Sequence, residues 1–341
     1  MKKMISFFIL ATFILIFAVA CDNNNETEEG NANESTDDKL TWASGAQGGG
    51  WYTTAGGLSS LILDETGIDI GTIPGGSMQN MPFVAENEAQ LAWMQPPFIQ
   101  AGLEGEDPFD QQFDDASIIG NGFGTNHFHL VVDASEEAES IDELFEDVSN
   151  IDIAVTPVNN SDEWIFQKIM EYYDTSYDDI KDKGGKISHG DYDEQADDLR
   201  NGNVKQVFAQ LALPASSVTE VSVNKDVKIL PFSDDLIDYL VEEYGLEDNT
   251  IPEGTYEDVE NGDEDIHTVS MGNVLTVNSN LDEDTVYEIT KAINDHEDEL
   301  SDIHESLDYY SLEDATKNLI GDLHPGAKKY YEEVDELNTD E

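Results

Sequence analysis

Cysteine and basic residues are scarce in this chain of 341 residues, which has one cysteine, Cys21, and 15 Lys and Arg against 75 Asp and Glu. A single cysteine allows no disulfide framework within the chain. The formal net charge of −60 excludes nucleic acid and anionic membrane surfaces as partners of the folded body, because like charges repel. Such a chain also repels itself, whereas molar salt shortens the Debye length to about 3 Å. The composition therefore predicts a salt-loving host.

Long apolar runs are also scarce, and the one that stands out lies at the N-terminus. Lys2 and Lys3 precede an apolar stretch over residues 5–20, which ends directly before Cys21. This order is typical of a secretory signal that ends at a lipid-modified cysteine. The alternative is a plain transmembrane anchor, but the run is shorter than the ~20 apolar residues that usually span a bilayer. We therefore predict a signal peptide over residues 1–20 and lipidation at Cys21.

The next segment, residues 21–39, carries no aliphatic side chain larger than alanine. Such a composition cannot bury enough apolar surface to fold. We predict a lipid-anchored disordered tether here, which would hold the protein at the outer face of the cytoplasmic membrane through its lipid alone.

From Leu40 onward, short apolar runs alternate with amphipathic stretches. This alternation is typical of α/β domains in which helices cover a parallel sheet, and the length suits two of them. A β-like stretch over residues 265–277 is expected to return to the first domain and complete its sheet. The prediction is a first lobe over residues 40–125 and 225–341, and a second lobe over residues 126–224.

Residues 44–52, with the sequence SGAQGGGWY, join the apolar run Leu40–Ala43 to a helical pattern. Glycines at such a junction leave backbone N–H groups free at the positive end of the helix dipole, where an anion can bind. No Gly-Lys-Ser/Thr closes the loop as in a P-loop, and no suitable ribose-binding acid follows about 20 residues later. A ligand of carboxylate size is the better interpretation.

Two further polar junctions follow strands, PGGSMQN over residues 74–80 and TPVNNSD over residues 156–162. Ligands of open α/β sheets bind beyond the carboxyl ends of the strands, so these loops are expected to converge on a cleft between the lobes. The alternative for Ser77, Ser161 or Asp162 is an ordinary helix N-cap.

These residues could bind the ligand in three ways. Because the one arginine, Arg200, is expected to face water, backbone N–H groups and side-chain hydrogen bonds would replace a guanidinium clamp. Trp51 and Tyr52 would cover an apolar stem, unless they pack in the core, and Asp162 could hold an ammonium group. The expected ligand-binding residues are Ser44, Gly48, Gly49, Gly50, Trp51, Tyr52, Ser77, Asn80, Gln95, Asn160, Ser161 and Asp162.

Four stretches resemble, in order, the motifs of one transporter family. Residues 45–52 resemble Gly-Ser-Thr-Gly-Gly-Thr-Tyr-Tyr, residues 74–80 resemble Thr-Gly-Gly-Ser-x-x-Asn, and residues 91–95 and 323–332 resemble the family's Gln-bearing strand and closing signature. The family is TAXI, the solute receptors of tripartite ATP-independent periplasmic (TRAP) transporters. Gly50 departs from it by replacing a hydroxyl residue, as does Trp51 by replacing a tyrosine.

The resemblance implies a type II periplasmic-binding-protein fold, two α/β lobes with a ligand cleft between them. Such a receptor closes on a small solute and hands it to the membrane permease subunits of the TRAP system. The solutes implied are small carboxylates or amino acids, glutamate-like or dicarboxylate. We expect no cofactor.

An enzyme is the alternative function. His127 and His129 alternate along a predicted strand, share one of its faces, and with a nearby acid could bind zinc in a metal-dependent extracellular enzyme. The competing interpretation is a pair of polar residues near the hinge. No Gly-x-Ser-x-Gly elbow surrounds Ser44, so a serine hydrolase is not indicated.

Overall fold

The computed structural model describes residues 39–47 and 49–337. The predicted signal peptide, Cys21, nearly all of the predicted tether and Gly48 lie outside the described residues. Among the residues that are described, no helix has the length and apolar character needed to cross a membrane.

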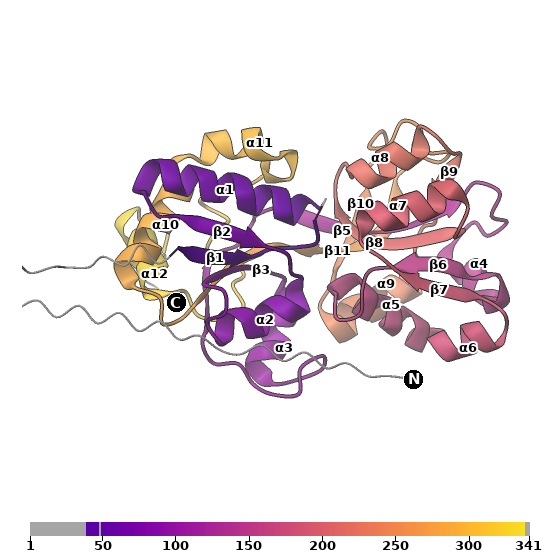
Figure 1. Cartoon of the computed structure of the whole chain (residues 1–341), viewed down its shortest axis with the longest axis horizontal. Coiled ribbons are helices and arrows are strands. Elements are labelled where there is room, and N and C mark those ends of the chain that lie inside the picture. Colours follow the sequence, from indigo (N-terminus) through magenta and orange to yellow (C-terminus); the bar gives the residue numbers. More distant parts are fainter. Residues whose placement is uncertain (1–38, 48, 338–341) are drawn as a thin grey trace, which may run out of the picture. The chain divides into compact units, whose positions relative to one another are not determined.

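The first lobe is built on a five-stranded sheet with the order β2-β1-β3-β12-β4. Strand β1 pairs in parallel with β2 and β3, whereas β12 runs antiparallel to β3 and β4. Its strands are β1 (Leu40–Ala43), β2 (Ile70–Ile73), β3 (Leu91–Met94), β4 (Ala116–Gly120) and β12 (Val274–Asn278). Its helices are α1 (Gly50–Thr66), α2 (Ser77–Ala85), α3 (Pro96–Glu104), α10 (Glu283–Asp295), α11 (Leu300–Ile303) and α12 (Pro325–Glu333). Figure 1 shows the indigo N-terminal and yellow C-terminal elements together in this lobe.

The second lobe has a seven-stranded sheet with the order β10-β11-β5-β8-β6-β7, and β9 pairs with β5. Its strands are β5 (Thr125–Asp133), β6 (Asp152–Val155), β7 (Lys186–His189), β8 (Gln206–Ala212), β9 (Val227–Ile229), β10 (Glu247–Ile251) and β11 (Ile266–Gly272). Its helices are α4 (Ile141–Glu146), α5 (Ser161–Tyr172), α6 (Tyr177–Asp182), α7 (Tyr192–Asn201), α8 (Ser216–Ser222) and α9 (Asp234–Tyr244).

The predicted β-like stretch over residues 265–277 divides between the two sheets. Strand β12 completes the first sheet as expected, but β11 pairs antiparallel with β5 of the second sheet. Residues 227–272 thus belong to the second sheet, in contrast to the predicted first lobe over 225–341. The reason is long-range pairing: β9 and β11 both add to β5, a partner about 100 or more residues earlier that local patterns do not reveal.

The chain crosses between the lobes at Gly120–Thr125 and again at Gly272–Val274. The two crossings are hydrogen-bonded to each other, because the Asn273 N–H donates to Gly124 O at 2.9 Å and the Phe123 N–H donates to Asn273 O at 3.3 Å. Gly124 has φ +88, a left-handed conformation that glycine adopts without strain. These paired crossings join the two lobes.

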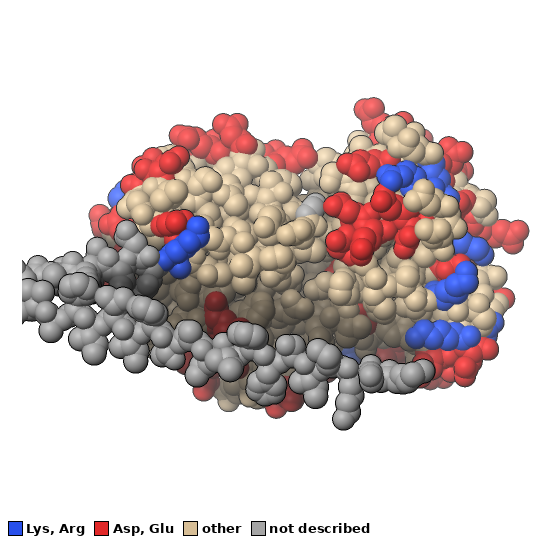
Figure 2. All heavy atoms as spheres, viewed as in Figure 1, with Lys and Arg blue, Asp and Glu red and all other residues tan. Residues whose placement is uncertain are grey.

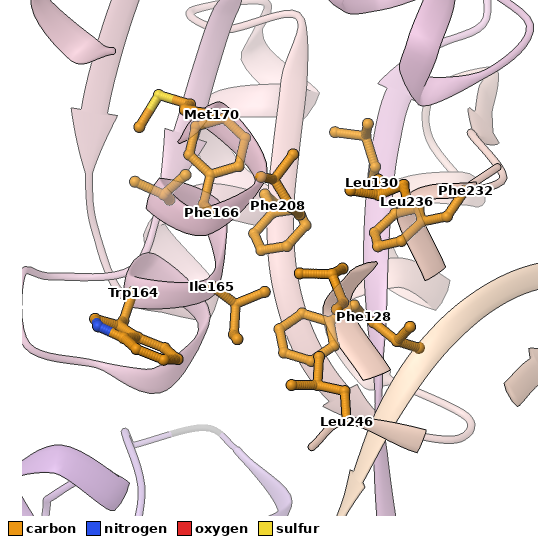
Figure 3. Packing of buried hydrophobic residues seen from close by; sticks show 14 of the residues in the cluster. Phe128, Leu130, Trp164, Ile165, Phe166, Met170, Phe208, Phe232, Leu236 and Leu246 are labelled. Atoms are coloured by element: carbon orange, nitrogen blue, oxygen red, sulfur yellow. The ribbon is translucent and has the colours of Figure 1, made fainter. Parts of the chain in front are cut away.

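The core of the second lobe contains aromatic side chains from α5 and both central strands. Phe208 of β8 lies 5.1 Å from Phe166 of α5 and 5.5 Å from Phe128 of β5, measured between ring centroids. Figure 3 shows these rings facing one another, with Trp164 turned away from them. Trp164 instead meets Phe98 of the first lobe edge-on at 5.4 Å. Near it, Lys168 forms a 3.0 Å ion pair with Asp107, so the lobes touch beside α5.

Candidate ligand-binding cleft

A cavity of about 50 Å³ lies where three strand-to-helix junctions meet β8 of the second lobe. The loop before α1, the glycine pair before α2 and the start of α5 bound it, as the sequence predicted for a cleft between lobes. Its polar lining comes from Asn126, Asn160, Ser161, Asp162, Tyr192 and Gln210, and the other lining residues are Gly45, Ala46, Gly49, Gly50, Trp51, Gly75, Gly76, Leu211 and Ala212.

Two of the helices that begin at this cavity, α1 and α2, lack N-terminal features that five other helices share. Helices α4, α6, α7, α9 and α10 each have a Ser or Asp side chain as N-cap and acidic residues in the first turn. Helices α1 and α2 have Gly49 and Gly76 as N-cap residues instead, with no side-chain cap and no acid in the first turn. The N–H groups of Tyr52 and Gln79 donate to Gly49 O and Gly76 O. The other first-turn N–H groups and both helix dipoles remain available to an anion.

Two amide side chains in the cavity wall have a polar atom that is buried without a partner. Gln210 is 4% exposed, and its Nε2 has no hydrogen-bond partner among the described residues. The same holds for Oδ1 of Asn126. An unpaired buried polar group is costly, so a donor and an acceptor in this wall indicate a polar ligand.

Asp162 is buried at the start of α5, where its carboxylate accepts three hydrogen bonds. Oδ1 accepts from the Thr156 hydroxyl at 2.9 Å, and Oδ2 accepts from the Tyr192 hydroxyl at 3.1 Å and the Gln210 N–H at 3.3 Å. Burial outweighs these bonds and raises the pKa of Asp162 to about 6. No Lys or Arg is among the described residues of the wall, so none of them offsets the charge of Asp162. An ammonium group on the ligand would do so and would favour the charged form of Asp162.

Because the pKa of Asp162 is raised, the free energy of unfolding should depend on pH. Asp162→Asn should remove this dependence. The folded protein holds the proton up to about pH 6, whereas the unfolded chain releases it near the ordinary value of 3.8. This group therefore lowers the free energy of unfolding as pH rises from about 4 to about 6. In ligand-free protein we expect Asp162→Asn to be more stable than wild type at pH 7, by up to about 3 kcal/mol, with the difference shrinking toward pH 4.

Urea unfolding at pH 4, 5.5 and 7 measures this difference, with the exposed Asp193→Asn as the matched control. A gap between Asp162→Asn and wild type that does not change with pH would contradict the raised pKa.

Glycines let the two lobes approach each other at the cavity. A Cβ atom on Gly49 would lie 3.4 Å from the ring of Tyr192, and one on Gly76 would lie 2.5 Å from Asn160 Oδ1. Both partners belong to the second lobe. The loops before α1 and α2 therefore face the second lobe directly.

The predicted ligand residues divide into two groups. Six of them line the cavity: Gly49, Gly50, Trp51, Asn160, Ser161 and Asp162. Ser44, Tyr52, Ser77, Asn80 and Gln95 are not among its lining residues. The buried Ser44 hydroxyl donates to Ile73 O at 2.7 Å, and the Ser77 hydroxyl donates to Gln95 Oε1 at 3.1 Å. These side chains hold the loops in place, and Tyr52 is half-buried on the first turn of α1.

Asn80 fixes the two glycine loops of the first lobe to each other. Its Nδ2 donates to Ser44 O and to Trp93 O, both at 2.8 Å, and its Oδ1 accepts from the Gly76 N–H at 3.1 Å. Asn80→Ala leaves these buried groups unpaired, so we expect it to lower the free energy of unfolding by about 3 kcal/mol. The exposed Gln79→Ala on the same helix should change it by less than about 0.5 kcal/mol. Equal losses in urea unfolding would contradict this role.

Sequence reasoning missed three polar residues of the wall, Asn126, Tyr192 and Gln210. Asn126 is the second residue of β5, Tyr192 is the first residue of α7 and Gln210 lies near the end of β8. Gln210 carries the one recoverable signal, a polar residue inside the apolar strand QVFAQLA. Arg200 pairs with Asp197 on the surface end of α7.

His129 of the histidine pair forms its contacts within the second lobe. His129 is buried, with Nδ1 2.9 Å from His127 O and Nε2 2.9 Å from the Tyr256 hydroxyl. Burial lowers its pKa to about 3. No group of three or more His, Cys, Asp or Glu is placed to hold a metal ion within residues 39–47 and 49–337. The described residues therefore do not support the zinc interpretation of His127 and His129.

Comparison with known proteins agrees with this architecture. Residues 42–334 match the model described as the NMT1-like family. A solved periplasmic binding protein, BugD, aligns with a TM-score of 0.51 and 13% identity, over 87% of this chain and 94% of its own. A structure described as a periplasmic transporter aligns with a TM-score of 0.50 and 11% identity, over 87% and 92%. The predicted type II periplasmic-binding-protein fold is thus confirmed, with two mixed α/β sheets.

Proposed function

Because the chain belongs to the NMT1-like family, we propose that it is an extracytoplasmic solute receptor, which captures a small carboxylate between its lobes and delivers it to a membrane transporter. The finer assignment is the TAXI family, with TRAP permease subunits as the partner. The motif resemblance over residues 45–52, 74–80, 91–95 and 323–332 supports that assignment. Lipidation at Cys21 would hold the receptor at the outer face of the cytoplasmic membrane.

One observation carries the carboxylate proposal. In a chain with 75 acidic residues, helices α1 and α2 begin at the cavity without an acidic residue in the first turn and without a side-chain cap. A ligand carboxylate at the N-termini of α1 and α2 would accept hydrogen bonds from the N–H groups of both helices and interact favourably with both dipoles. Gln210 Nε2, buried and unpaired on the opposite wall, supplies a further donor.

Asp162 decides between two kinds of carboxylate ligand. A zwitterionic amino acid would place its ammonium group beside Asp162, which then stays charged. A dicarboxylate would instead favour the protonated form of Asp162. The raised pKa of this carboxyl makes that form easier to reach. Affinity for amino acids should therefore rise with pH between 5 and 7, and affinity for dicarboxylates should fall.

A thermal-shift screen of carboxylates, amino acids and metal ions tests the proposal. A ligand at 100 times its dissociation constant adds about 2.7 kcal/mol to the free energy of unfolding, which raises the melting temperature by several degrees in a chain of this size. We expect saturable stabilisation by a carboxylate and no turnover of it. Stabilisation by zinc alone, with zinc-dependent turnover, would contradict the receptor and favour an enzyme.

A further inference from the structure

A second cavity, of about 100 Å³, adjoins the first. The two share Gly49, Gly50, Tyr192, Leu211 and Ala212 as a common wall. The second cavity is completed by Thr53, Pro214, Ala215, Ser216, Ser217 and His304. In contrast to the first cavity, which contains Asp162, no acidic side chain is among the described residues that line it.

Gly50 lies in the wall that the two cavities share, and we call the space beside it the neck. A Cβ atom built on Gly50 would lie 3.5 Å from Cε1 of His304 in the first lobe and 3.6 Å from Cβ of Ala212 in the second. Any side chain larger than alanine would therefore fill the space between the lobes at this point. Gly50 stands where the resembling motif has a hydroxyl residue, and its missing side chain keeps the neck open.

His304 presents a hydrogen-bond donor to this neck. Its Nδ1 accepts from the Ser306 N–H at 3.1 Å and lies 2.8 Å from the Ser306 hydroxyl. A neutral imidazole whose Nδ1 accepts carries its proton on Nε2. Partial burial lowers the pKa of His304, so the ring is neutral at pH 7. Nε2 lies 3.6 Å from the position of the Gly50 Cβ, on the side of the ring that faces the cavities.

We propose that the two cavities form one ligand site with two compartments, and that His304 Nε2–H binds a second carboxylate at the far end of an elongated ligand. The first carboxylate would occupy the N-termini of α1 and α2, and the chain of the ligand would pass Gly50. The Ser216 and Ser217 hydroxyls border the same compartment. This inference rests on the proposed carboxylate receptor and adds to it the length and the second acidic group of the ligand.

Calorimetric titration with linear α,ω-dicarboxylates from succinate to suberate tests the proposal, with the monocarboxylate of equal length beside each. We expect wild type to bind a diacid of five carbons or more at least ten times more tightly than the matching monoacid. Gly50→Val, which fills the neck, should remove at least tenfold in affinity for these diacids. His304→Ala should weaken diacids about tenfold and leave monoacids unchanged, and His304→Gln, which keeps a donor, should restore part of the loss.

The outcomes separate this inference from the function on which it rests. If wild type binds none of these acids, the carboxylate receptor itself is wrong. If wild type binds them but Gly50→Val retains its affinity for long diacids, or His304→Ala weakens monoacids and diacids equally, the receptor stands and the second compartment is overturned.

Discussion

Gly49→Asp is expected to weaken carboxylate binding at least 100-fold. Gly49 is the N-cap of α1, and a side chain there would project toward the cavity, 3.4 Å from Tyr192 of the opposite lobe. A fixed carboxylate would occupy the positive end of the α1 dipole and repel the ligand. Two like charges 4 Å apart at an effective dielectric of 20 repel by about 4 kcal/mol, which alone corresponds to more than two orders of magnitude in affinity.

The matched control for this variant is Gly56→Asp on the same helix. A Cβ atom at Gly56 meets no heavy atom within 4 Å, and Gly56 does not line either cavity. Both variants add one negative charge to α1, so the general charge of the protein changes equally. Calorimetry with the stabilising carboxylate should show near wild-type affinity for Gly56→Asp. Unchanged affinity in Gly49→Asp, or equal losses of affinity in the two variants, would contradict a ligand bound at the N-terminus of α1.

The melting temperature is expected to rise by more than roughly 10 °C between 0.1 M and 2 M NaCl, because salt screens the repulsion among surface acids. Asp162 and Glu163 are the only buried acids among the described residues, so nearly all of the described negative charge faces solvent. Figure 2 shows acidic side chains well in excess of basic ones on the visible face. Exposed ion pairs such as Lys39–Asp69 offset little of this repulsion.

Sucrose provides the control for this measurement, since it strengthens burial by exclusion from the surface without screening charge. The sucrose concentration is chosen so that sucrose and NaCl raise the melting temperature of a neutral reference protein equally. In this protein we expect NaCl to raise the melting temperature far more than sucrose does. A melting temperature that is indifferent to NaCl would contradict the salt-loving character that the composition predicts.

The first half of the first lobe could be predicted from the sequence because neighbouring residues carry the signal. Apolar runs of four residues followed by glycines and an amphipathic stretch locate β1 and α1, and then β2 and α2. The second crossing between the lobes could not be predicted in the same way. Residues 265–277 look like one strand, and only the pairing of β11 with β5 and of β12 with β3 divides them at Asn273.

The site shows the same division between local and long-range information. Helix starts are local features, so Gly49, Gly50 and Asn160 could be assigned to the cavity from the loops that contain them. The role of a polar side chain within such a loop depends on what lies opposite: Asn80 donates to the carbonyl of Trp93 and is not among the residues that line the cavity. Gln210 faces the cavity because β8 ends there, and this position follows from strand order alone.

Mass spectrometry of the small molecules released from gently purified protein tests the central claim most directly. Wild type and the Gly49→Asp and Gly56→Asp variants would be purified in parallel in high salt and then denatured. We predict that wild type and Gly56→Asp release a small organic acid at about one molecule per chain, and that Gly49→Asp releases none. A released molecule without an acidic group, or the same acid in equal amount from Gly49→Asp, would contradict a carboxylate receptor whose anion site is the N-terminus of α1.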